Sequence, residues 1–110
     1  KDPYTALVLA SKRLSSSVLD WCAREEPSAA LEHCAKLLSP STLDWCARDR
    51  PWAALEFAVK LLTADTLEYC ARGDPQWALE FAADLVTPST LKWCKEQAVI
   101  YMLAGAGSDH

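Results

Sequence analysis

The chain has 110 residues, which suits one domain and leaves little room for two. Hydrophobic residues make up 51% of the chain and charged residues 24%, a balance that excludes a disordered tail. Eleven Lys and Arg against fifteen Asp and Glu give a net charge of −4. This negative net charge argues against nucleic acid or an anionic membrane as the main partner, because both require a basic surface.

One unit of 24 residues recurs along the chain. Prolines recur at this spacing, at Pro3, Pro27, Pro51 and Pro75. Cysteines recur at the same spacing, at Cys22, Cys46, Cys70 and Cys94. Residues 27–50 and 51–74 are identical at 13 of their 24 positions. We therefore expect four tandem helical repeats, 3–26, 27–50, 51–74 and 75–98, and after them a C-terminal helix extension with a flexible tail, 99–110.

Each unit predicts two helices. The longer one begins at the proline, which is favoured at the first helical position, and residues 51–62 are an example. Asp2 and Asp74 precede such a proline, where a side-chain acceptor can cap the helix. The shorter helix begins after a Ser or Thr cap, as at Ser39 and Thr87. It ends near the next proline, because proline disfavours helix in the residue before it.

The shorter helices carry a charge pattern. In the first three, an acidic residue precedes an arginine by four positions, as in Asp20–Arg24, Asp44–Arg48 and Glu68–Arg72. In the fourth, both signs are reversed, giving Lys92 and Glu96. A reversal at both ends is expected when the two side chains face each other across one helical turn. The alternative is a set of unrelated, solvated charges.

A helix pair of this length cannot bury its apolar side alone, so successive units must stack. The sequence predicts an all-α fold, a right-handed α-solenoid of about four 24-residue helix-pair repeats.

A family resemblance supports this fold. The pattern Leu-x-x-Cys-Ala-Arg-x-x-Pro-x-x-Ala-Leu-Glu-x-Ala-x-x-Leu-Leu-Ser/Thr-Pro-Ser-Thr resembles the leucine-rich repeat variant, and also short-helix repeat arrays of bacterial proteins. The resemblance covers residues 3–98. It departs at residues 54–56, where Ala-Leu-Glu replaces the Val-Arg pair of that family, and the cysteine cluster that holds an iron–sulfur centre ahead of some such repeats has no match. The resemblance implies a solenoid and no catalytic residues.

The repeated cysteines are expected to form a ladder. Neighbouring rungs should lie roughly 9–10 Å apart, one helix diameter, which is too far for a disulfide. The sequence has no Cys-x-x-Cys pair, no glycine-rich loop and no catalytic cluster, so we expect no catalytic residue, no metal and no cofactor. Two interpretations stay open. The cysteines are small buried apolar residues, or they form a thiol-dependent module that binds metal or senses oxidants.

Aromatic residues are the better candidates for a binding site. A second ladder, one position before each cysteine, consists of Trp21, Trp45, Tyr69 and Trp93. These rings either fill the groove between units or form a partly exposed stripe that docks a peptide or a partner helix. Trp52 and Trp77 break the repeat on the longer helices, and we expect them to face a partner.

The two ends of the stack differ from its middle. In the first unit, Leu7, Leu9 and Leu14 have no polar cap, which indicates a longer array or a partner at that end. At the other end, Val99 replaces the proline, so the last helix is expected to continue to Leu103 and to stop at residues 105–107. This apolar segment should fold over the last repeat or make a homodimer contact.

Together these features predict a non-enzymatic module or scaffold for protein–protein interaction that presents an aromatic-bearing face. The expected partner is another protein or peptide, with no nucleic acid and no membrane, and the exposed solenoid ends could join two copies. Reduced thiols in this number favour a cytoplasmic location.

Overall fold

The structure is a computed structural model that describes residues 2–108, with side chains described up to Ala104. Its α-helices are α1 (Pro3–Ala10), α2 (Ser16–Glu25), α3 (Pro27–Cys34), α4 (Pro40–Asp49), α5 (Pro51–Phe57), α6 (Ala64–Gly73), α7 (Pro75–Phe81) and α8 (Pro88–Ser108). Three short 3₁₀ helices are η1 (Ser11–Arg13), η2 (Ala35–Leu37) and η3 (Val59–Leu61). Residues 2–108 contain no strand, so the described chain is all-α.

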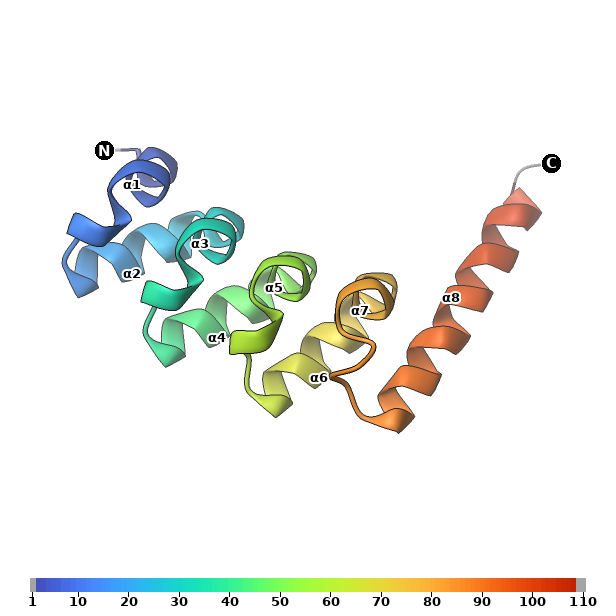
Figure 1. Cartoon of the computed structure of the whole chain (residues 1–110). Coiled ribbons are helices and arrows are strands. Elements are labelled where there is room, and N and C mark those ends of the chain that lie inside the picture. Colours follow the sequence, from blue (N-terminus) through green and yellow to red (C-terminus); the bar gives the residue numbers. More distant parts are fainter. Residues whose placement is uncertain (1, 109–110) are drawn as a thin grey trace.

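The α-helices form two rows. One row holds α1, α3, α5 and α7, and the other holds α2, α4, α6 and the first part of α8 (Figure 1). Each helix of a row contacts the next helix of the same row and its own partner in the other row. The molecule extends 49 Å along its longest axis and 16 Å along its shortest. The hydrophobic core is therefore an elongated layer between the two rows of helices and not a single compact centre.

The helices of the first row, α1, α3, α5 and α7, are shorter than the sequence predicts. A single helix was expected over residues 51–62, but α5 ends at Phe57 and η3 follows after Ala58. Ala58 has φ −134° and ψ 18°, and Ala10, Cys34 and Ala82 have almost the same values. No Gly or Pro marks this break. The helices that begin after Ser or Thr, such as α6 with 10 residues, are the longer ones.

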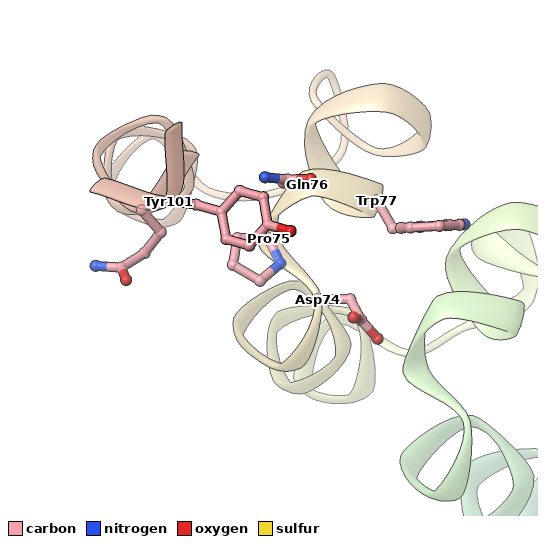
Figure 2. Close-up of a pocket in the computed structure, with 6 residues that line it drawn as sticks. Asp74, Pro75, Gln76, Trp77 and Tyr101 are labelled. Carbon is pink, nitrogen blue, oxygen red and sulfur yellow. The ribbon is translucent and has the colours of Figure 1, made fainter. Parts of the chain in front are cut away.

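Side-chain caps begin the second helix of each pair. Ser39 and Thr87 accept hydrogen bonds from the backbone N–H groups three residues on, each over 3.3 Å, as predicted. Ser15 and Thr63 do the same. Asp2 caps α1 by accepting from the Tyr4 N–H over 3.1 Å. The predicted cap at Asp74 is wrong, because its carboxylate makes no cap bond to α7 and points away from that helix (Figure 2).

Small residues let the helices of the second row approach closely. Ala23, Ala47 and Ala71 have no exposed surface. Their carbonyl oxygens each accept a hydrogen bond from a cysteine thiol of the next unit, over 3.4–3.7 Å, at Cys46, Cys70 and Cys94. The described cysteines are all buried, which confirms the prediction that they lie on the core side. A larger residue at the alanine position would push the two helices apart.

The last helix does not stop where the sequence predicted. Val99 can continue a helix where proline begins a new one in the other units, and α8 runs on through residues 105–107 to Ser108. Residues 99–103 are 56–68% exposed, so the segment does not fold over the last repeat. The end of the predicted flexible tail, residues 109–110, lies outside the described residues. Among the described helices, none is both long and apolar enough to cross a membrane.

Candidate functional site

The aromatic ladder lies on the surface of the second row of helices. The exposed fractions of Trp21, Trp45 and Tyr69 are 52%, 39% and 49%, and Trp93 is half-buried. Three of these rings are covered on one face by an arginine of the preceding unit. The guanidinium-to-ring distances are 5.2 Å for Arg24 over Trp45, 4.8 Å for Arg48 over Tyr69 and 5.0 Å for Arg72 over Trp93.

We call this alternation of arginine and aromatic side chains the stripe; it comprises Trp21, Arg24, Trp45, Arg48, Tyr69, Arg72 and Trp93. Each stacked pair is worth about 0.5–1 kcal/mol at an exposed site. The rings of Trp45, Tyr69 and Trp93 are therefore held in place, and Trp45 and Tyr69 keep much of their surface accessible. The stripe is hollowed around Trp45, where a shallow pocket of about 360 Å³ is lined by Arg24, Ser41, Asp44, Trp45, Arg48 and Asp49.

The acidic residues beside the stripe reach across to the next unit. Asp44 accepts a hydrogen bond from the hydroxyl of Thr66, and Glu68 accepts one from Thr90. The arginines reach the same hydroxyl oxygens, at 3.5 Å from Arg48 Nη2 to Thr66 and 3.2 Å from Arg72 Nη2 to Thr90. These threonines are buried. A cluster of acid, arginine and threonine thus joins units two and three, and another joins units three and four.

The predicted ion pairs within one helix are present in only one case. Arg48 Nε lies 3.1 Å from Asp44 Oδ2. Asp20 with Arg24 and Glu68 with Arg72 make no ion pair among the described side chains. The four-residue spacing places both side chains of a pair on the edge that contacts the next unit. Contact between units explains the spacing better than pairing within a helix does.

These hydrogen bonds change the acidity of the carboxylates. The hydrogen bond from Thr66 holds the pKa of Asp44 below its ordinary value, and Arg48 adds to this effect against the opposing effect of burial. Burial by itself would raise the pKa of Glu68, but hydrogen bonds from Thr90 and Thr87 hold it below its ordinary value. Both carboxylates are therefore charged at neutral pH, as their threonine and arginine partners require.

The junction of units one and two lacks this cluster. Thr42 occupies the position of Thr66 and is equally buried, but its hydroxyl has no hydrogen-bond partner among the described residues. Arg24 still stacks on Trp45 there. In the first unit, Val18 stands at the position equivalent to Thr42, and it is exposed.

Trp52 and Trp77 form a separate aromatic group on the first row. Their ring centroids lie 6.3 Å apart in an edge-to-face arrangement, and Phe57 packs edge-to-face on Trp52 at 6.5 Å. Trp77 Nε1 donates to Glu56 Oε1 over 3.3 Å. Both indoles are more than a third exposed. The six aromatic residues predicted as partner-facing are thus divided between the two rows of helices.

A pocket of about 320 Å³ lies between the start of α7 and the middle of α8. It is lined by Asp74, Pro75, Gln76, Trp77, Gln97 and Tyr101. Figure 2 shows Tyr101 near Pro75, whereas the Trp77 side chain extends from α7 away from Tyr101. Gln97 and Tyr101 were not predicted as site residues. The feature of the sequence that could have indicated them is Val99, which stands where the other units have proline. Without that proline α8 continues as one helix, and no further helix packs against α7.

The buried cysteines are poor nucleophiles. Burial raises the pKa of the Cys46 and Cys70 thiols to about 12 and that of Cys34 to about 11. Only the thiolate attacks an oxidant or binds a metal. No group of three or more His, Cys, Asp or Glu side chains converges on a metal-sized site within the described part of the chain.

Comparison with known proteins gave no match to a family model, a curated protein or a solved structure.

Proposed function

We propose that the chain is a non-enzymatic protein-interaction module, a right-handed α-solenoid of 24-residue units whose stripe binds another protein or peptide. The single observation that supports it most is that two rings of the stripe, Trp45 and Tyr69, are both exposed and stacked against an arginine. Trp, Tyr and Arg dominate the energetics of protein interfaces. A side chain that is already ordered loses little conformational entropy on binding.

The solenoid is supported by the repetition of local geometry. Equivalent helices of successive units contact each other. The equivalent residue at the C-terminal end of each helix of the first row has nearly the same backbone angles in all four units, at Ala10, Cys34, Ala58 and Ala82. The kinship with the leucine-rich repeat variant stays a proposal that rests on the sequence pattern. Five buried free thiols support a cytoplasmic location.

The thiol-dependent alternative has less support. Its cysteines are buried, and the thiols of Cys46, Cys70 and Cys94 donate to backbone carbonyl groups. Burial raises the pKa of these three thiols and that of Cys34. The repeated thiols are better explained as small residues at a close helix contact.

The test is a quantitative capture of binding proteins with the native chain and three variants. The variant Trp45→Ala with Tyr69→Ala removes the centre of the stripe. Leu85→Ala is the matched control, because it shortens an exposed apolar side chain in the loop between α7 and α8. A third variant, Trp52→Ala with Trp77→Ala, probes the aromatic group of the first row.

We expect one or more proteins to bind the native chain and the Leu85→Ala variant equally. When such a protein is purified and its affinity is measured, it should bind the stripe variant at least tenfold more weakly. Equal binding by the native chain and the stripe variant would contradict the proposal. If only the Trp52→Ala, Trp77→Ala variant loses binding, the interaction face lies on the first row.

A further inference from the structure

A second surface follows the three 3₁₀ helices, which succeed one another along one side of the stack (Figure 1). Each of η1, η2 and η3 contains a lysine, at Lys12, Lys36 and Lys60, and none of the three contains an acidic residue. All three lysines are exposed. Lys36 and Lys60 belong to units that have a neighbour on each side, so their exposure does not arise at an end of the stack. A chain of net charge −4 thus presents a row of positive charges here, one in each of three successive units.

The acidic residue that could neutralise each lysine, one helical turn before it, is engaged elsewhere or missing. Glu32 Oε1 lies 3.7 Å from His33 Nε2. Glu56 accepts the hydrogen bond of Trp77 Nε1 over 3.3 Å. The first unit has Val8 at this position. Among the described side chains, none of the three lysines makes an ion pair. Their charges are therefore available to an external anion.

Apolar side chains border the lysines. Leu37 and Leu61 directly follow two of them and are 43% and 40% exposed. A pocket of about 350 Å³ is lined by residues of three successive units, among them Lys12, Lys36 and Phe57. Both leucines line the same pocket. We call this surface the lysine face; it comprises Lys12, Lys36, Leu37, Phe57, Lys60 and Leu61.

We propose that the lysine face binds an extended acidic peptide of a partner protein, with an acidic residue at every third position and apolar residues between. Unpaired cations beside a pocket with apolar walls match a ligand that carries both carboxylates and apolar side chains. Helices that pack side by side lie about 8–10 Å apart. A polyproline II peptide advances about 9 Å in three residues and returns every third side chain to the same face. One carboxylate per turn of the peptide can therefore reach one lysine per unit.

A flat anionic membrane matches this surface less well than a narrow peptide does. Glu32 lines the same pocket as Lys36, and Glu56 and Glu80 hold the equivalent exposed positions in the next two units. In the fourth unit, Asp84 replaces the lysine. A bilayer would meet these carboxylates together with the lysines, whereas a peptide can follow the lysines alone. The three glutamates are fixed on the helices that form the face and cannot fold over it.

The experiment titrates synthetic peptides into the full chain by isothermal titration calorimetry. The probe repeats Glu-Pro-Leu three times. A second peptide has the same composition with its glutamates adjacent at one end, and a third repeats Glu-Pro-Ser. The variant Lys36→Gln with Lys60→Gln removes two charges from the lysine face. Its matched control, Lys92→Gln with Lys95→Gln, removes the same charge from two exposed lysines of α8 that lie outside this face.

We expect the native chain and the α8 control to bind the Glu-Pro-Leu peptide equally, and the Lys36→Gln, Lys60→Gln variant to bind it about fivefold more weakly or less. The other two peptides should bind the native chain more weakly than the probe does. Added salt should weaken binding, because exposed charges are screened. Equal binding by the native chain and the Lys36→Gln, Lys60→Gln variant, or no binding at about 1 mM probe, would overturn the proposal.

Three further measurements separate the occupants. Vesicles of phosphatidylcholine and phosphatidylserine should not bind the native chain, and binding that Lys36→Gln with Lys60→Gln abolishes would assign the face to a membrane and contradict the proposal. Self-association abolished by the same variant would assign it to a second copy, with the same consequence. The stripe variant, Trp45→Ala with Tyr69→Ala, should bind the probe as the native chain does. Loss of the probe in that variant would place the peptide on the stripe and contradict the lysine face alone.

Discussion

The guanidinium of Arg48 lies 4.8 Å above the ring of Tyr69, which belongs to the following unit. The same arginine pairs with Asp44 and reaches the hydroxyl of Thr66. One side chain therefore connects a surface ring, a carboxylate and a buried hydroxyl across a single junction. The stability of the stack and the order of its exposed stripe depend on the same contacts.

Arg48→Ala should lower the free energy of unfolding by about 1 kcal/mol, and the coupling to Tyr69→Ala in a double-mutant cycle should be about 0.5–1 kcal/mol. Urea denaturation of the four chains measures both. Arg50→Ala is the matched control, because Arg50 is exposed and pairs only with its neighbour Asp49 among the described side chains. A coupling near zero between Arg48 and Tyr69 would show that the stacked geometry adds no stability.

Thr66→Val and Thr42→Val should differ in their effect on the free energy of unfolding, although the two threonines occupy equivalent buried positions. Thr66→Val removes the hydroxyl that donates to Asp44, and should cost about 1 kcal/mol or more. Thr42→Val replaces a buried hydroxyl that has no partner, and should be neutral or stabilising. Urea titrations of both variants provide the comparison. Equal losses would mean that the hydrogen bond to Asp44 contributes nothing.

The stability of the protein should fall in mild acid. The folded pKa of Asp44 and that of Glu68 lie below their ordinary values. Each carboxylate therefore contributes stability above its unfolded pKa, about 4, and this contribution is lost as the pH falls through that value toward the folded pKa. We expect a declining free energy of unfolding between about pH 5 and pH 3.

Asp44→Asn isolates one part of this decline. The variant should be less stable than the native chain at pH 7, and the two stabilities should converge as the pH falls below the lowered folded pKa of Asp44 and the native carboxylate becomes protonated. Glu25→Gln, an exposed residue on α2, serves as the control for the loss of one charge. Parallel pH profiles for Asp44→Asn and the native chain would contradict the role given to the Thr66 hydrogen bond.

The buried thiols should react only when the stack opens. Because burial raises the pKa of Cys46 and Cys70 to about 12, almost no thiolate is present at pH 8 in the folded chain. Labelling with a disulfide reagent should be slow in the native protein and should accelerate sharply across the urea unfolding transition. Rapid labelling of the folded chain, or copurification of bound metal, would favour the thiol-dependent alternative.

Several features could be read from the sequence because their cause is local. A proline fixes the first turn of a helix, and Ser39 or Thr87 can cap one from three residues away. Repetition of Cys46 and Cys70 among apolar neighbours indicated burial, which the structure confirms. The break after Phe57 was missed, because Ala58 has a high helical propensity and only its packed surroundings bend the chain there.

The functional surface depended on contacts that sequence spacing does not reveal. The arginines appeared to pair within a helix, four residues away, but their aromatic partners lie 21 residues further along, on the next unit. A helical wheel describes one helix and cannot say which residue of a neighbouring helix faces it. The sequence alone therefore determined that helices recur every 24 residues and where they begin. Only the stacking of one unit on the next decided which aromatic rings were left exposed and which of them an arginine holds in place.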